Sequence, residues 1–214
     1  SAASDVYKRQ SLNILNASLC NEELTEEERY ELIRKQAMLL SKMEWLIATL
    51  LKISKLDAGT ITLKLQEVYL KDVVEKAIRP LEIAAELKMQ TIKKEVPAEL
   101  KLTLDVEWTA EALENVIKNC IEHSPEGGSI EIKAIERPLL TQVIIEDNGA
   151  GFQEKDIPHL FDRFYQGNGS TIGNAGLGLA LAKTIINNQG GIIRAKNQEL
   201  GGAEFEICFY RGLL

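Results

Sequence analysis

The chain has 214 residues, of which 45% are hydrophobic and 27% charged, the composition of an ordinary globular protein. Its formal net charge of −7 argues against a general nucleic-acid binder, as does the lack of basic runs interleaved with aromatic residues. Cys20, Cys120 and Cys208 are widely spaced and odd in number, which fits reduced thiols in a cytoplasmic protein better than disulfides or a metal cluster. No apolar run reaches the ~18 residues that a membrane-spanning helix needs, so we expect a soluble chain whose membrane anchor, if any, lies upstream.

The first part of the chain predicts a helical hairpin. Residues 1–10 carry no helical periodicity and resemble a non-native leader, whereas residues 11–20 place leucines on one helical face. Thr25 and Glu28 form a capping box that begins a second helix, which we expect to run to about Lys55. Its apolar stripe repeats every seven residues and is wider than a two-stranded seam requires. Pairing with a second copy would cover it in a four-helix bundle, although packing on its own domain remains an alternative.

Asp57-Ala58-Gly59 predicts a domain boundary, so that residues 11–57 form a partial hairpin and residues 58–214 a separate domain. The second domain reads as an α+β sandwich, with one mixed sheet and helices on one face. We expect helices at about 70–87, at 107–123 and from 176 to about 187, and strands at 61–65, 91–96, 100–104, 129–136, 142–146, 192–196 and 203–209.

One acidic residue stands at the end of a predicted strand, beside glycines. Asp147 follows an apolar run typical of a buried strand and precedes Asn148-Gly149-Ala150-Gly151. Glycines tolerate positive φ and let a ligand approach the backbone closely. Asp147 is therefore suited to accept a hydrogen bond from a flat polar group such as an adenine amine.

A second glycine cluster follows, after a polar loop that we expect to be mobile, residues 166–175. Gly176-Leu177-Gly178-Leu179 opens an apolar helix, whose free N-terminal amides and dipole would form an anion site. The chain has no Gly-x-x-x-x-Gly-Lys-[Ser/Thr] motif, and Gly173-x-x-Gly176-x-Gly178 reverses the dinucleotide fingerprint. Together with Asp147, the cluster predicts a nucleotide site of another kind.

The predicted helix 107–123 carries polar residues on a face that its apolar residues leave free. Asn115, Asn119, Glu122 and His123 fall within about one third of the helix circumference, by the 3.6-residue period. An asparagine oxygen is a suitable Mg²⁺ ligand, since Mg²⁺ usually takes one or two protein ligands plus waters and phosphates. The alternative is that these amides only cap the helix or face solvent.

In their order along the chain, these segments resemble the sensor histidine kinases of two-component systems. The N box is ENVIKNCIEHSPEGGSIEI, the first glycine box EDNGAGF, the F box FDRFYQG and the second glycine box GNAGLGLALAK. SKLDAGTI resembles the junction between the dimerisation hairpin and the catalytic domain of that family. The resemblance covers about residues 11–210.

The resemblance implies a Bergerat-type (GHKL) ATP-binding sandwich behind a dimeric helical hairpin, with ATP and Mg²⁺ as cofactors. Asn119 would ligate Mg²⁺, Asn115 would support the nucleotide, and Asp147 would accept from the adenine amine. The remaining residues of the boxes that would line the nucleotide are Gly149, Gly151, Phe161, Gly173, Gly176, Leu177, Gly178 and Leu179. The implied partners are a second copy of the chain and a response regulator, in the cytoplasmic portion of a membrane-anchored bacterial receptor.

The chain departs from the family pattern at three places on the phosphate side. Glu122 and His123 stand where many members carry Lys and Tyr; Glu122 would point away or accept a proton, and His123 would contact phosphate or interact with the helix dipole. Gln166 replaces a basic residue, which leaves Arg163 as the nearby cation. Ala203 replaces a threonine and removes a hydroxyl group.

The fourth departure concerns the phosphoacceptor histidine, which family members carry on the first hairpin helix. The two histidines of this chain, His123 and His159, lie outside the predicted hairpin, and we expect His159 to be a surface or packing residue. We therefore expect that the acceptor has been cut away with the N-terminus and that the chain binds ATP but does not phosphorylate itself.

Two other functions remain open at this stage. A degenerate, non-catalytic interaction module would explain the substitutions at Glu122, Gln166 and Ala203. The retained Asn119, Asp147 and box glycines argue against this function. A related ATPase that phosphorylates serine on a protein would share the nucleotide motifs, but that class typically lacks the long heptad hairpin.

Overall fold

The computed structural model describes residues 25–166, 176–199 and 201–210. The chain divides into two compact units, residues 1–51 and residues 52–214. The predicted leader and the predicted helix at residues 11–20 lie outside the described residues, as does most of the polar loop at 166–175.

Helix α2, Glu26–Asp57, begins at the predicted capping box and crosses the division between the units. The Glu28 carboxylate accepts from the Thr25 backbone N–H at 3.0 Å, and the Thr25 hydroxyl accepts from the Glu28 N–H at 3.3 Å. The reciprocal pair satisfies amides that the first turn leaves without partners. The helix ends two residues beyond the predicted Lys55, where Gly59 takes a positive φ of 63°.

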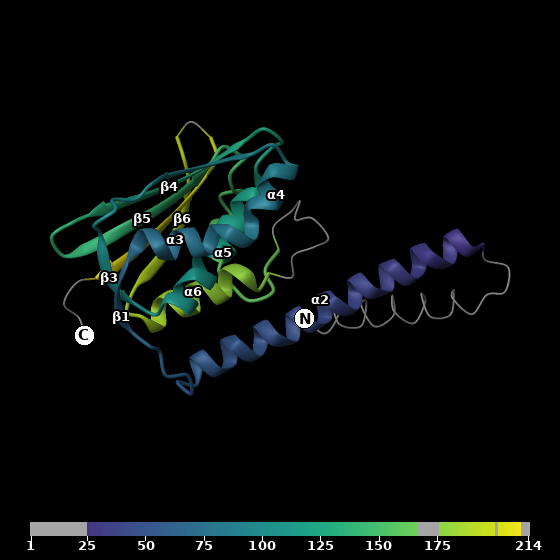
Figure 1. The fold of residues 1–214 in the computed structure, drawn as a ribbon, viewed down its shortest axis with the longest axis horizontal. Helices are drawn as coiled ribbons and strands as arrows, with labels where there is room; N and C mark the ends of the chain where they lie inside the picture. The colour runs from purple at the N-terminus through teal and green to yellow at the C-terminus, as the bar shows by residue number, and fades with distance from the viewer. Residues whose placement is uncertain (1–24, 167–175, 200, 211–214) are drawn as a thin grey trace. The chain divides into compact units, whose positions relative to one another are not determined.

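The larger unit is built on a five-stranded mixed sheet with helices on one face, which confirms the predicted α+β class (Figure 1). The strand order is β2-β4-β5-β7-β6, in which only β2 and β4 pair in parallel. The strands are β2 Thr91–Glu95, β4 Ser129–Glu136, β5 Leu140–Asp147, β6 Ile192–Asn197 and β7 Ala203–Tyr210. Helices α5, Val106–His123, and α6, Gly178–Asn188, pack against each other on the covered face.

The predicted helix at 70–87 is interrupted. Helix α3, Leu70–Ile78, is followed by a 3₁₀ turn, Arg79–Leu81, and by α4, Glu82–Leu87. Pro80 accounts for the break, because proline has no backbone N–H and its ring clashes with the preceding helical turn. A second 3₁₀ turn, Ile157–His159, also contains a proline.

The predicted strand at 61–65 is wrong. That segment is not part of a strand, and the Lys64 N–H donates to the Asp105 carboxylate at 2.7 Å instead of to a neighbouring strand. Strand β1 lies further on, at Gln66–Tyr69, and pairs antiparallel with β3, Lys101–Leu104. These two strands form a separate two-stranded sheet.

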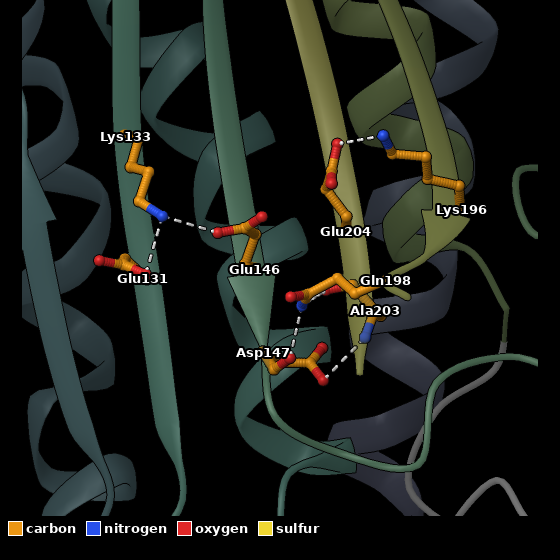
Figure 2. A network of polar contacts seen from close by, with 8 residues as sticks. All are labelled: Glu131, Lys133, Glu146, Asp147, Lys196, Gln198, Ala203 and Glu204. Carbon is orange, nitrogen blue, oxygen red and sulfur yellow. Dashed lines mark hydrogen bonds and ion pairs between the residues drawn. The ribbon is translucent and has the colours of Figure 1, made fainter. Parts of the chain in front are cut away.

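Alternation along the central strands separates a buried face from an outer face. On β5, Val143 and Ile145 are fully buried under the helices, whereas Glu146 points to the outer face. There Lys133 contacts Glu131 at 2.9 Å and Glu146 at 3.0 Å, and Lys196 pairs with Glu204 at 3.1 Å (Figure 2). Asp147 shares the parity of Val143 and Ile145, so the strand delivers its carboxyl group to the helical side of the sheet.

Candidate functional site

Asp147 is the last residue of β5 and is only 5% exposed. Its Oδ1 atom accepts from the backbone N–H groups of Gly149, at 2.8 Å, and of Ala203, at 3.2 Å. Two amide donors hold the carboxylate in one orientation. The Cys120 thiol also hydrogen-bonds to this carboxyl group, so the carboxyl group is in contact with α5 as well as with the glycine loop.

The glycine loop after Asp147 lies against the C-terminal end of α5. A Cβ atom on Gly149 would stand 2.6 Å from the His123 carbonyl oxygen, a distance that real side chains do not tolerate. Gly151 has a φ of 72°, and a Cβ there would stand 2.6 Å from Asn197 Oδ1. Both glycines are therefore required by close approach, Gly149 to the C-terminal end of α5 and Gly151 to Asn197.

The start of α6 meets α5 on the same side of the sheet. A Cβ on Gly178, the first residue of α6, would stand 2.7 Å from Asn115 Oδ1. The Asn115 amide group donates to the Glu111 carbonyl at 2.8 Å, which turns its oxygen toward Gly178. The predicted anion site at the α6 N-terminus is thus adjacent to the polar face of α5.

Gly176 joins the second glycine box to the F box. Its carbonyl accepts from the Phe164 N–H at 2.9 Å, and its φ of 68° places the missing Cβ 2.2 Å from the Tyr165 carbonyl oxygen. Phe164 and Gly176, which flank the segment 167–175, are consequently held side by side. The segment itself, with the predicted Gly173, lies outside the described residues.

The other predicted residues of α5 occupy its accessible side. Asn119 and Glu122 are half-buried and His123 is exposed, whereas Val116, Ile117 and Cys120 are fully buried. Within the described ranges no group of three or more His, Cys, Asp or Glu could hold a metal ion. A metal at this site would therefore rely on an amide oxygen such as that of Asn119, with its other ligands from outside the protein.

The F-box residues lie beyond this junction. Phe161 stands edge-on to Phe205 at 6.4 Å between ring centroids, and the Lys183 ammonium lies 5.6 Å from the Phe161 ring. Arg163, the predicted cation, forms an ion pair with Asp57.

His159 is exposed and contacts the Asp162 carboxylate at 2.8 Å, as expected of a surface residue. Leu177 is buried and Leu179 half-buried.

Sequence reasoning missed three residues around Asp147. Burial, followed by the negative charge of Asp147, raises the pKa of the Cys120 thiol. Asn197 and Gln198, at the end of β6, hydrogen-bond to the two ends of the loop 147–152. Their signal was local: two adjacent amides where a strand ends, just before Gly201-Gly202.

The geometry defines a strand-end carboxylate, a glycine loop and a helix N-terminus gathered beside α5. Residues 104–212 match the model of the histidine kinase-, DNA gyrase B- and HSP90-like ATPase family, and the chain belongs to that family.

Two similar proteins indicate a narrower group within this family. The chain is 34% identical over 196 residues to the sensor protein KdpD of Clostridium acetobutylicum, a match covering 87% of this chain and 21% of that protein. It is 29% identical over 163 residues to the sensor histidine kinase WalK of Bacillus subtilis, covering 74% of this chain and 27% of WalK. These matches confirm the resemblance to sensor histidine kinases. The chain spans only about a fifth to a quarter of the length of these two relatives.

The fold agrees with a solved histidine kinase. The Acinetobacter baumannii histidine kinase AdeS superposes with a TM-score of 0.77 at 22% identity, covering 95% of this chain and 96% of that one. Among the described residues, no helix is both long and apolar enough to cross a membrane.

Proposed function

We propose that this chain is the ATP-binding region, with part of the dimerisation hairpin, of a sensor histidine kinase that binds Mg²⁺-ATP. The observation that carries the proposal is the meeting of three segments: Gly149 lies against the end of α5, and Gly178 against Asn115 in its middle. Asp147 is the last residue of β5, and Gly178 is the first residue of α6.

The residues present fit an adenine nucleotide. Asp147 Oδ2 accepts from the adenine amine, while Oδ1 stays bonded to the protein. The absence of a Cβ on Gly178 lets the start of α6 lie close to Asn115, and the first amides of α6, with the helix dipole, would favour phosphate oxygens. Asn119 supplies one oxygen ligand to Mg²⁺, which would neutralise phosphate charge during transfer.

Transfer of the γ-phosphate to a histidine relies on positioning and charge neutralisation. Neither His123 nor His159 lies in α2, so we propose that the acceptor histidine comes from another polypeptide segment and that this chain does not phosphorylate itself. Relay to an aspartate of a response regulator would follow. The solved complex of the histidine kinase ThkA with the response regulator protein TrrA, TM-score 0.76 at 18% identity, supports the choice of partner; it covers 98% of this chain and 60% of that one.

Calorimetry of ADP binding tests the nucleotide site. Asp147→Asn removes the charge that accepts from the amine, and we expect a loss of about 1.5–3 kcal/mol, roughly 10- to 150-fold in Kd. The matched control is Glu146→Gln, one residue earlier but on the outer face with Lys133, which should bind ADP like the wild type. Equal ADP affinity in wild type and Asp147→Asn would refute the role of Asp147.

A second experiment tests the metal. We expect Asn119→Ala to abolish Mg²⁺-dependent phosphate transfer to a separately supplied hairpin that carries the acceptor histidine. Asn188→Ala, at the far end of α6, is the control and should transfer at the wild-type rate. Full transfer by the Asn119 variant would count against this metal assignment.

A non-catalytic interaction module is the second candidate, favoured by the substitutions on the phosphate side. Glu122 brings a carboxylate where triphosphate charge would lie, and it stands 4.0 Å from Lys118. The replacement of threonine by Ala203 is less harmful to a nucleotide site than the lost hydroxyl group suggests, because Ala203 contacts Asp147 through its backbone N–H. A folded wild-type chain that binds neither ADP nor a non-hydrolysable ATP analogue would favour this candidate.

A further inference from the structure

The end of β6 carries two adjacent amide side chains to which the proposed nucleotide contacts assign no role. Asn197 is the last residue of β6, and Gln198 is the next residue along the chain. Because successive residues of an extended chain point in opposite directions, the two side chains reach different parts of the molecule. Both nevertheless contact the loop 147–152, one at each end.

Gln198 holds the beginning of the loop. Its Nε2 group donates to the carbonyl oxygens of Asp147, at 2.8 Å, and of Ala203, at 3.0 Å (Figure 2). The register between β5 and β7 ends one residue earlier, at Glu146 and Glu204, so the side chain bridges carbonyls at the point where the ladder stops. Gly202 makes room: with a φ of 99°, a Cβ there would stand 2.0 Å from the Asp147 carbonyl oxygen.

Asn197 holds the end of the loop. Its Oδ1 accepts from the Phe152 N–H at 2.7 Å, and its Nδ2 donates to the Phe152 carbonyl at 2.8 Å. The side-chain amide thus pairs with one residue through two hydrogen bonds, as a neighbouring strand would. Gly151 again makes room, since its Cβ would stand 2.6 Å from Asn197 Oδ1.

These contacts reach the carboxylate of Asp147 through Ala203. The Ala203 N–H donates to Asp147 Oδ1, while the Ala203 carbonyl is held by Gln198. The second donor to Oδ1 is the N–H of Gly149, which lies inside the loop that Gln198 and Asn197 hold at its ends. The orientation of the carboxylate therefore depends on both amides, which lie about 50 residues away in the sequence.

We propose that Asn197 and Gln198 are positioning residues that give the site its selectivity for adenine over guanine. The proposal rests on the nucleotide-binding function proposed above. A fixed Asp147 Oδ2 meets the amine of adenine but faces the O6 oxygen of guanine, where two acceptors repel each other. A carboxylate free to turn adapts to either base, so loosening the loop weakens binding of adenine more than binding of guanine.

The test compares Kd for ADP and for GDP in near-isosteric variants that lack the donors. Gln198→Met removes both side-chain hydrogen bonds of Gln198, and Asn197→Leu removes both side-chain hydrogen bonds to Phe152. The matched control is Gln142→Met, an equal substitution on β5 whose amide bonds to Glu206 at 2.8 Å on the outer face. We call Gln198→Met and Asn197→Leu the clamp variants. We expect each of them to lose about ten-fold in ADP affinity with little change in GDP affinity. The control should keep the wild-type ratio of the two Kd values.

Thermal unfolding and hydrogen exchange separate positioning from stability alone. In both clamp variants we expect the amides of Gly149 and Phe152 to exchange faster, while core amides of β5 stay protected. A lower Tm with unchanged ADP affinity and ADP-to-GDP ratio would overturn the proposal, as would an equal loss for both nucleotides. Failure of the wild type to bind ADP would refute the underlying nucleotide function instead, and is visible before any variant is made.

Discussion

One carboxylate oxygen of Asp147 accepts hydrogen bonds from the protein, and the other is proposed to accept one from the ligand. Oδ1 accepts from Gly149 and Ala203, which orients the group, and the proposed contact with a ligand amine uses Oδ2. A single residue thus links the fold to recognition. For this reason a substitution such as Asp147→Ala would disturb the loop as well as the contact with the ligand, and Asp147→Asn is the sharper variant.

The described cysteines are expected to be poorly reactive. Burial, followed by a hydrogen bond to Glu206, raises the pKa of the Cys208 thiol to about 11, and burial also raises the pKa of Cys120. Since the thiolate is the nucleophile, we expect native-state alkylation by iodoacetamide at pH 8 to be slower than for a free thiol by on the order of ten-fold or more. Mass spectrometry of a Cys20→Ser variant measures both sites, with the urea-unfolded chain as control. Rapid native labelling of either would contradict the assignment.

Glu114 on α5 provides a pH-dependent test of stability. Burial, followed by the negative charge of Glu111, raises its pKa. A carboxyl group whose pKa is higher in the folded than in the unfolded state contributes stability that is present at low pH and is lost as the pH rises through the folded pKa. Glu114→Gln should therefore raise the free energy of unfolding at pH 7, by on the order of 0.5 kcal/mol because part of the side chain stays in water.

The gain from Glu114→Gln should disappear below about pH 4, where the wild-type carboxyl group is protonated in both states. Urea unfolding at the two pH values measures it. Glu86→Gln on α4, where the glutamate is exposed, is the control and should change little at either pH. A gain of equal size at both pH values would show that charge is not its cause.

At the scale of elements, α5 is the organising helix of the site, and its C-terminal end is capped from outside. Lys88 Nζ donates to the carbonyls of Ile121, at 2.7 Å, and of Glu122, at 3.0 Å. Gln90 Nε2 donates to the carbonyl of Ser124 at 3.0 Å. Carbonyls at a helix C-terminus lack intrahelical partners and favour a positive charge, so both residues stabilise the end that contacts the glycine loop.

We expect Lys88→Met to lower the free energy of unfolding by about 1.5–3 kcal/mol, the usual effect of losing a hydrogen bond from a charged group. The measurement is urea unfolding followed by circular dichroism. Lys93→Met, an exposed lysine on β2, controls for the loss of charge and should change stability by less than about 0.5 kcal/mol. Equal stability of the two variants would mean that the cap contributes nothing.

At the scale of the whole molecule, α2 leaves a heptad row of apolar side chains exposed. Ile33, Leu40 and Ile47 are 51%, 54% and 59% exposed. Apolar residues repeated every seven positions favour association with other helices, and the proposed homodimer would use this row. We therefore expect concentration-dependent self-association of the chain through this row.

Sedimentation at increasing concentration tests this association. Leu40→Glu places a charge in the apolar row and should keep the chain monomeric at every concentration. Ser41→Glu adds the same charge one residue later, outside the row, and should associate like the wild type. Self-association that survives Leu40→Glu would place the interface elsewhere on the molecule.

Local patterns in the sequence determined much of the fold. The capping box placed the start of α2, apolar periodicity placed α5, and strict alternation placed β4 at Ser129–Glu136. Each of these signals depends on residues within a few positions of one another. The order of the four motifs was enough to indicate the family, and Asp147 with its two glycines was placed correctly at the end of a strand.

Only the tertiary structure decided which residues hold that site in shape. Asn197 and Gln198 contact a loop about 50 positions away, and Lys88 caps a helix that ends 35 positions later. The segment 61–65 has a strand-like alternation, but the Asp105 side chain takes the hydrogen bond that a neighbouring strand would need. Such contacts join residues far apart in the chain, and no local periodicity encodes them, because they exist only once the sheet has paired and the helices have packed.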